Sequence, residues 1–260
     1  MSTYHRRPKF SSGAILRNEY LVALEQQSFD FPGLLFRGYG NGILSGCELS
    51  TTSDTIMMGP GVISYEGVLY GIHEPLSVKY LPTDEIKYLK LYIGSNEGNS
   101  NCIVRRFSLK LADQGALGSG EFELCRFRLQ PGAYLRCTYT DFRDRDTLYD
   151  TLNIIHSTYA ALESNGLSPA ITKAYAEEVL GIADVPALDA AVCINWLAQQ
   201  YALPAKVVQS YLKRCDCMDD ETTGNQELYQ GLLTRLEQLK EGGNAPQRNR
   251  RSGRRTIIVE

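Results

Sequence analysis

The segment TIMMGPGVISYEGVLYGI, from Thr55 to Ile72, indicates the fold of the first half of the chain. It consists of short runs of β-branched, aliphatic and aromatic residues, separated by glycine and proline. Such runs are typical of strands, and glycine and proline between them are typical of tight turns. A phosphate-binding glycine loop would be followed by a helix, whereas here another strand follows. We therefore predict hairpin turns at Gly59–Gly61 and at Glu66–Gly67.

Similar runs extend from this segment as far as residue 140. The predicted strands cover residues 55–58, 61–65, 67–72, 76–81, 86–93, 102–111, 121–130 and 133–140. A slip in the alternation at Cys125 and Arg126 predicts a β-bulge. Many short strands at this spacing favour an antiparallel β-sandwich or barrel-like domain, which we assign to residues 38–142. Residues 1–37 are predicted to form an N-terminal arm with a short helix at 15–27.

Residues 143–242 instead follow the 3.6-residue period of amphipathic helices. Apolar residues between Leu148 and Leu162 are spaced by four and three, which predicts one helix there. Further helices are expected to begin at Ser168–Pro169, at Pro186 and at Pro204.

One predicted helix is assigned to the centre of the group, and one more helix completes the group. The segment 187–201 is apolar on most sides, and we place it at the centre of the helical group. A last helix runs through residues 228–239. The sequence therefore predicts a small bundle of about five short helices after the β-domain, and an α+β fold class overall.

The composition is that of a folded protein that is not destined for a membrane. The 260 residues carry a formal charge of -3, and 43% of them are hydrophobic. No run approaches the roughly 18 apolar residues that span a bilayer, and the first residues lack the apolar stretch of a signal peptide. The seven cysteines are odd in number and scattered, so we expect reduced thiols.

Several motifs resemble functional sites but lack a required part. Cys215 and Cys217 have no second pair of cysteine or histidine nearby for zinc. The aspartates of DFRDRDTLYD, residues 141–150, lack the glycine and closing glutamate of a calcium loop, and we interpret them as favourable charges at a helix start. His156 is interpreted as a boundary residue in mid-helix, and Ser119 lacks the nucleophile-elbow glycine. We predict no catalytic residues, no metal site and no cofactor.

The last eighteen residues, 243–260, form a basic arm that ends in a short β-branched run. Arginine clusters suit acidic surfaces, and a strand-forming end suits addition to the edge of a partner's sheet. Nucleic acid is not expected as a partner, because no recognised binding motif accompanies the arginines. The predicted partner-binding residues are Arg248, Arg250, Arg251, Arg254, Arg255, Thr256, Ile257, Ile258 and Val259.

The segments GNGILSGCELS, TIMMGPGVISYEGVLYGI, LSVKY and IKYLKLYI together resemble a known type of β-domain. This domain opens many tail-fibre and baseplate-associated proteins of tailed phages and related contractile injection systems. The resemblance covers residues 38–93 and lies mainly in turn chemistry. It implies a structural adaptor without enzymatic activity. The helical second half departs from the β-rich tip of a fibre, which favours an assembly component over a receptor-binding tip.

The sequence therefore predicts a non-enzymatic structural component of a phage tail, baseplate or contractile injection particle. Its expected partners are other tail or baseplate subunits, in a homo-oligomer or a hetero-assembly. We expect assembly in the cytoplasm of a bacterial host, followed by residence in the virion or injection particle. The alternative is a carbohydrate-binding module with a sugar-stacking face of tyrosines, formed by Tyr65, Tyr70, Tyr80, Tyr88 and Tyr92.

Overall fold

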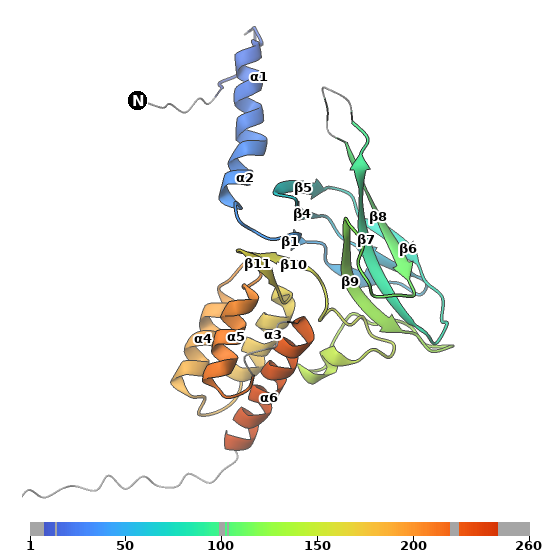
Figure 1. Cartoon of the computed structure of the whole chain (residues 1–260), viewed down its shortest axis with the longest axis vertical. Helices are drawn as coiled ribbons and strands as arrows, with labels where there is room; N and C mark the ends of the chain where they lie inside the picture. Colours follow the sequence, from blue (N-terminus) through green and yellow to red (C-terminus); the bar gives the residue numbers. More distant parts are fainter. Residues whose placement is uncertain (1–7, 14, 99–101, 103, 219–223, 244–260) are drawn as a thin grey trace, which may run out of the picture.

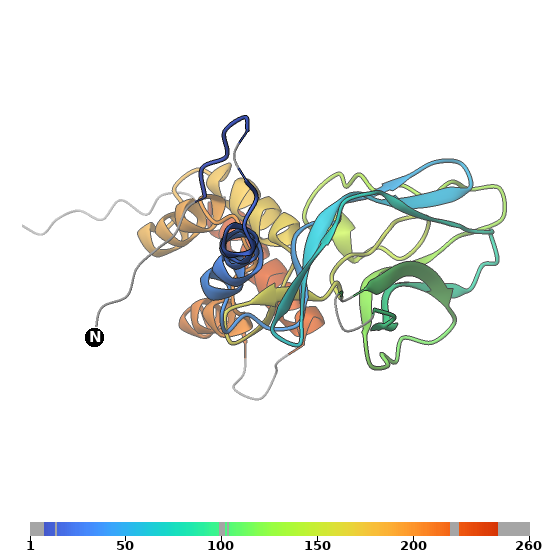
Figure 2. The ribbon, with the colours of Figure 1, turned by 90° about the horizontal axis from the view of Figure 1, so that it is seen from above.

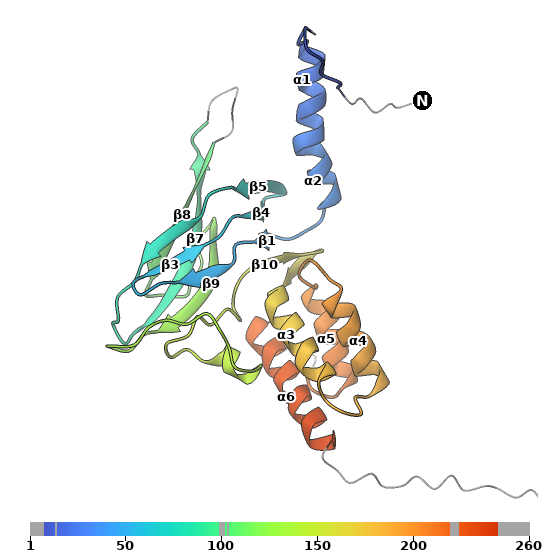
Figure 3. The ribbon, with the colours of Figure 1, turned by 180° about the vertical axis from the view of Figure 1, so that it is seen from behind.

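A computed structural model describes residues 8–13, 15–98, 102, 104–218 and 224–243. The fold is α+β, with the sheets in the N-terminal half and a group of helices in the C-terminal half (Figure 1). A helical arm at the start of the chain projects away from both parts (Figures 1 and 3). Seen from above, the sheets and the helical group lie side by side, with the arm viewed end-on over the helical group (Figure 2).

The strands of the described residues form three sheets, and these do not close into a barrel. The five-stranded sheet has the order β11-β10-β1-β4-β5, and the two three-stranded sheets have the orders β2-β3-β6 and β8-β7-β9. The strands are β1 (Gly42–Gly46), β2 (Leu49–Thr51), β3 (Thr55–Met58), β4 (Gly61–Tyr65), β5 (Val68–Ile72), β6 (Leu76–Lys79), β7 (Ile86–Asn96), β8 (Arg105–Ala112), β9 (Glu121–Arg128), β10 (Tyr159–Ala161) and β11 (Ser164–Gly166).

The two predicted turns in the segment 55–72 have different structures. Glu66 and Gly67 have φ angles of 51° and 76° and join β4 to its partner β5, as a tight hairpin requires. Gly59 and Pro60, in contrast, connect β3 to β4, which belong to different sheets, so the prediction of a hairpin there was wrong.

The reason is a close approach of two chain segments at this corner. Gly46 pairs with Gly61, and a Cβ atom on Gly46 would lie 2.4 Å from the Pro60 carbonyl oxygen. The Cys47 N–H donates to that same oxygen at 3.0 Å. The connections β1–β2 and β3–β4 therefore change sheets side by side, and glycine is needed to let them touch.

The predicted bulge in the strand β9 is present, one residue away from its expected place. Leu89 of β7 pairs with Cys125, but the next residue, Lys90, pairs with Glu123, so Leu124 is the extra residue. The strand predicted at 133–140 does not form. That segment is irregular and makes an isolated bridge between Arg136 and Thr151.

The helices fall into an N-terminal and a C-terminal group. The arm contains α1 (Asn18–Glu25), the π-helical turn η1 (Gln26–Asp30) and α2 (Phe31–Leu35), and a 3-10 turn, η2 (Arg143–Asp146), precedes the C-terminal group. That group consists of α3 (Pro169–Leu180), α4 (Ala187–Leu197), α5 (Ala205–Arg214) and α6 (Asn225–Gly243).

Helix starts in the C-terminal group agree with the sequence. The Ser168 hydroxyl caps α3 by accepting from the Ala170 N–H, and α4 and α5 begin directly after Pro186 and Pro204. The placement of α4 at the centre was wrong, because its Leu188 and Ile194 are exposed. The centre is formed by α3 and α6 with buried residues of their neighbours.

The helix predicted between Leu148 and Leu162 was also wrong, because this segment is extended and irregular. Its backbone bonds to β9, as in the reciprocal pair between Arg126 and Asn153 at 2.9 Å in both directions. Leu152 belongs to the core of the β-domain and Ile155 to the core of the helical group. The helical spacing arose because alternate apolar residues enter two different cores.

Candidate functional site

The helical arm presents apolar side chains to solvent over most of its length. Ala23 is the buried residue of α1, and η1 and α2 contain none. Phe29 is 73% exposed and Leu34 is 66% exposed. The exposed apolar residues of this helical stretch are Leu21, Val22, Leu24, Phe29, Phe31, Leu34 and Leu35, and we call them the arm face.

The base of the arm is fixed to the body of the protein. Phe36 makes edge contacts with Tyr39 and Tyr201, at centroid distances of 5.4 and 5.1 Å. The Gly40 N–H donates to Ala161 at 2.9 Å, and the Glu163 N–H donates to Gly38 at 2.7 Å. The arm therefore leaves the body from a defined point, beside the β10–β11 hairpin and the loop that contains Tyr201 (Figure 1).

An apolar surface like the arm face is usually covered by another protein segment. Contiguous apolar residues on a protein surface mark interaction sites more often than free surface. An isolated helix of this length is marginal in water and normally gains its stability from packing. The arm face is thus suited to docking against another polypeptide.

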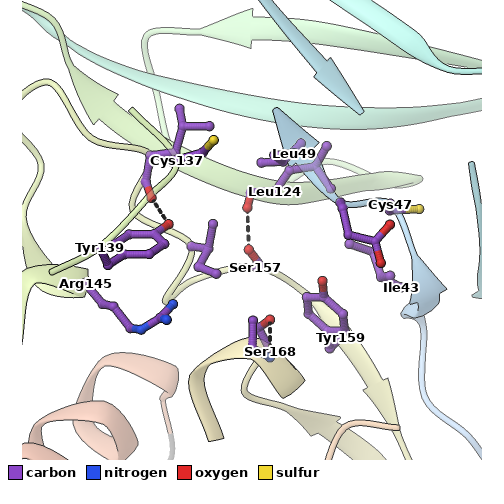
Figure 4. Close-up of a pocket in the computed structure, with 14 residues that line it drawn as sticks. Ile43, Cys47, Leu49, Leu124, Cys137, Tyr139, Arg145, Ser157, Tyr159 and Ser168 are labelled. Atoms are coloured by element: carbon purple, nitrogen blue, oxygen red, sulfur yellow. Dashed lines mark hydrogen bonds between the residues drawn. The ribbon is translucent and has the colours of Figure 1, made fainter. Parts of the chain in front are cut away.

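A second feature is a cavity of about 300 Å³ at the junction between the β-domain and the helical group (Figure 4). Its walls come from the strands β1, β2, β9 and β10, from the segment 137–157, which includes η2, and from the start of α3. Apolar side chains cover most of the wall, namely Ile43, Leu49, Leu124, Leu152 and Ile154. Domain junctions are a preferred place for ligand pockets.

The hydroxyl groups of this cavity are engaged with the protein itself. Tyr139 donates to the Leu152 carbonyl at 2.5 Å, and Ser157 donates to the Leu124 carbonyl. Ser168 accepts from the Ala170 N–H at 3.3 Å, and burial raises the pKa of Tyr159. These bonds fix the wall of the cavity in one arrangement.

Arg145 differs from its neighbours because its charge is not paired. Its guanidinium stacks on the Tyr139 ring at 4.3 Å and extends toward the centre of the cavity (Figure 4). The buried Nε atom has no hydrogen-bond partner, and within the described ranges the group forms no ion pair. Burial lowers the pKa of Arg145. The nearby carboxylate of Asp144 is already held by Arg136 at 2.5 and 2.6 Å.

The two thiols of the cavity are not activated. Burial, with a smaller effect of Glu48, raises the pKa of Cys47 to about 12, so it stays protonated at neutral pH. All seven cysteines are free, including the half-buried Cys137 in the same wall.

The aspartates of residues 141–150 are occupied by protein donors. Asp144 holds Arg136 and the Thr140 N–H, while Asp146 accepts from Gln226 and Gln230 on α6. Asp150 accepts from the Gln130 N–H at 3.0 Å. These aspartates therefore hold together the junction between the β-domain and the helical group. They do not begin a long helix, so their interpretation as charges at a helix start is corrected.

The other residues considered as functional candidates from the sequence are Cys215, Cys217, His156 and Ser119, and none of them lies in an arrangement suited to the proposed chemistry. Cys217 donates to the Cys215 carbonyl at 3.2 Å, and the part of the chain that the structure describes contains no cluster of three His, Cys, Asp or Glu suited to a metal ion. His156 lies in an irregular segment, not in mid-helix, where burial lowers its pKa. The Ser119 hydroxyl lies 3.4 Å from that of Tyr65.

The five tyrosines proposed for sugar stacking do not share one open face. Tyr80 is buried. Arg126 lies over the Tyr88 ring and Lys110 over the Tyr92 ring, at 5.1 and 3.9 Å from the centroids. Each of these cations therefore covers one face of its ring, which a stacked sugar could not also occupy.

The predicted basic arm, Arg248 to Val259, lies outside the described residues. Sequence reasoning missed both the arm face and Arg145. The apolar residues of 21–35 were a signal for the first, because they are too closely spaced for a one-sided helix. Arg145 had no signal, because its lack of a partner depends on the packing of the junction.

No helix among the described residues is long and apolar enough to cross a membrane. No family model and no curated protein matches the chain. Among solved structures, the chain is similar to one in the type VI secretion TssK-TssF-TssG baseplate subcomplex, with 11% identity, a TM-score of 0.42, and coverage of 92% of this chain and 100% of that one. It is also similar to TssK from the EAEC type VI secretion system bound to a nanobody, with 9% identity, a TM-score of 0.44, and coverage of 84% and 96%.

A third similar structure is a chain of the baseplate complex from the type VI secretion system, with 10% identity, a TM-score of 0.40, and coverage of 92% of this chain and 100% of that one. Phage tail fibres are not among these matches. TM-scores in this range lie below those that identify a shared fold.

Proposed function

We propose that the chain is a non-enzymatic structural subunit of a contractile injection particle or phage tail, where it joins neighbouring baseplate or tail subunits. The observation that carries this proposal is the arm face, a projecting helix with seven exposed apolar residues. A chain that worked alone would leave these side chains in water. Docking on a neighbour would bury them, at roughly 1.5 to 3 kcal/mol for each side chain that goes from exposed to fully buried.

The body of the protein supports a mechanical role. Phe142, at the end of the β-domain, is buried in the helical core and stacks on Tyr229 at 4.8 Å. Arg136 and Asp144 pair across the same junction. These contacts hold the sheets and the helices together, and the contacts of Phe36 with Tyr39 and Tyr201 attach the base of the arm to the same body. A body held in this way suits a subunit that fixes the positions of its neighbours.

The basic arm is proposed to be a second attachment point. Its arginines would guide it to an acidic surface, and Thr256–Val259 would pair with a sheet edge of the partner. The subunit would be assembled in the cytoplasm of the bacterial host and then remain in the particle. Replacing Arg250, Arg251, Arg254 and Arg255 by glutamine should weaken association and reduce its salt dependence. An association that is unchanged by the four substitutions would remove the basic arm from the proposal.

The main test measures how much of each arm variant is incorporated into particles. The particles are purified by sedimentation from the cells that produce the protein. The double substitution of Phe29→Asp and Leu34→Asp should leave the melting temperature of the chain almost unchanged, because both side chains are exposed. It should remove the chain from the particle fraction. Gln26→Asp adds a charge to the same helix without removing an apolar side chain, and it should be incorporated normally. Incorporation of the double variant at the wild-type level would refute the proposal.

A further inference from the structure

The cavity at the domain junction combines a shaped apolar wall with one unpaired cation. Buried charges in proteins are normally paired, because removing a charge from water is costly. Arg145 remains charged at any physiological pH. In the described structure its guanidinium has the Tyr139 ring below it and no carboxylate to bind. Arg145 is half-buried, and its donors, including the buried Nε, are not used by any protein acceptor in the described residues.

We propose that this cavity binds a small molecule that carries one carboxylate on an apolar body. The carboxylate would accept hydrogen bonds from the Arg145 guanidinium, which presents a planar donor set that matches it. The apolar body would lie against Leu49, Leu152 and Ile154. This site is separate from the arm face and does not depend on the role of the arm.

The charges around the cavity favour a single negative charge. Glu48 also lines the cavity, so a second negative charge on the ligand would meet repulsion. The acidic groups that act on Arg145 from elsewhere are Glu177 and Asp144, and Asp144 is already neutralised by Arg136. The single cation Arg145 can compensate one negative charge of a ligand, and Glu48 would repel a second, so the site suits a monoanion better than a phosphate dianion.

The hydroxyls of the wall are already hydrogen-bonded within the protein. Tyr139 and Ser157 donate to backbone carbonyls, and Ser168 accepts from the Ala170 N–H. They hold the wall in place around the ligand, so that Arg145 is the group that selects the anion. Binding would then depend strongly on this one side chain.

The test uses the full chain and sodium benzoate as the probe, with binding measured by calorimetry. Benzyl alcohol is the neutral analogue, and inorganic phosphate is the other anion. Benzoate should bind the wild type, and Arg145→Gln should weaken it roughly tenfold or more, the usual effect of losing a hydrogen bond to a charged group. Arg145→Lys should retain part of the affinity. Arg143→Gln removes the same charge from an exposed neighbouring position and should leave benzoate binding unchanged.

A second variant and a second readout guard against misfolding. Ala170 is exposed at the rim of the cavity, so Ala170→Phe should obstruct entry in a folded protein. Benzoate should also slow the alkylation of Cys137, which lies in the wall, but not that of the exposed Cys102. The proposal is overturned if benzoate does not bind at millimolar concentration, if it binds Arg145→Gln or Ala170→Phe as well as the wild type, or if benzyl alcohol or phosphate binds more tightly.

Discussion

Replacement of Arg235 by leucine is expected to destabilise the helical group far more than replacement of both Arg235 and Asp189. Asp189 on α4 is 0% exposed. It accepts from Arg235 Nε and Nη2 on α6 at 2.9 and 2.8 Å, and from the Tyr211 hydroxyl on α5 at 2.6 Å. The Tyr211 hydroxyl in turn lies 2.7 Å from that of Tyr175 on α3. The Asp189 carboxylate therefore links α4 directly to α5 and α6, and through the Tyr211 hydroxyl to α3.

The expected loss in free energy of unfolding depends on whether a buried charge remains without its partner in each variant. Arg235→Leu leaves a buried carboxylate with the Tyr211 hydroxyl as its remaining donor, and breaking a buried pair in this way costs about 3 to 5 kcal/mol. We expect the lower end, because the Arg235 side chain is partly exposed. Changing Asp189 and Arg235 together to leucine removes both charges, and such replacements cost little or even stabilise.

The assay is urea unfolding of the full chain, followed by the fluorescence of Trp196. This is the single tryptophan of the sequence, and it lies 5.9 and 5.4 Å from the rings of Tyr175 and Tyr211, so it reports on the helical group. With a slope of about 2 kcal/mol per molar urea, a loss of about 3 kcal/mol lowers the midpoint by roughly 1.5 M. Equal losses in the single and the double variant would refute the reasoning.

The same network predicts a dependence of stability on pH. Burial alone would raise the pKa of Asp189, but hydrogen bonds from Arg235 and Tyr211 outweigh it and hold the pKa below its ordinary value. The stabilisation is then present above the pKa of the unfolded chain, about 3.9, and is lost as pH falls below it. The wild type should lose stability on acidification faster than the double leucine variant. Parallel pH profiles would contradict this assignment.

Two further predictions concern the junction. Gly166→Ala should lower the melting temperature by several degrees, because the new Cβ atom would lie 1.9 Å from the Leu203 carbonyl oxygen. Gly132→Ala, which meets no atom within 4 Å, should cost less in spite of the φ of 85° at Gly132; equal losses would count against it. Asp144→Asn should cost about 1 to 3 kcal/mol at neutral pH, since Arg136 and the Thr140 N–H hold the pKa of Asp144 well below its usual range. This cost, measured by urea unfolding, should shrink as the pH falls below about 4, because protonation of Asp144 in the unfolded wild type then removes the advantage of its charged form; a cost that persists in acid would contradict it.

Local chemistry was sufficient to predict many of the elements. Glu66–Gly67 forms a hairpin because glycine and a polar residue accept the positive φ angles of the turn. Ser168 with Pro169 begins a helix because a hydroxyl cap and a fixed φ suit a first turn. The α+β class followed from the change in hydrophobic period, since period two and period 3.6 bury different faces.

The errors arose where one segment serves more than one neighbour. Residues 148–162 have helical spacing because Leu152 and Ile155 enter two cores, and periodicity cannot tell one helix face from two separate cores. Gly59 and Pro60 have turn chemistry in either case, but the partner of each strand decides whether they close a hairpin or change sheets. Pairing depends on residues distant in sequence.

The same distinction between local sequence and tertiary structure applies to the two candidate sites, the arm face and the cavity with Arg145. The apolar residues of the arm are fixed by the sequence, but their exposure is decided by the tertiary structure, in which α2 contacts β5 while Phe29 and Leu34 remain exposed. Arg145 is one of many arginines in the sequence, and its neighbour Asp144 would be its obvious partner. The fold gives Asp144 to Arg136 instead and turns Arg145 toward a cavity, because hydrogen-bond geometry at the junction, and not proximity along the chain, decides which charges are paired.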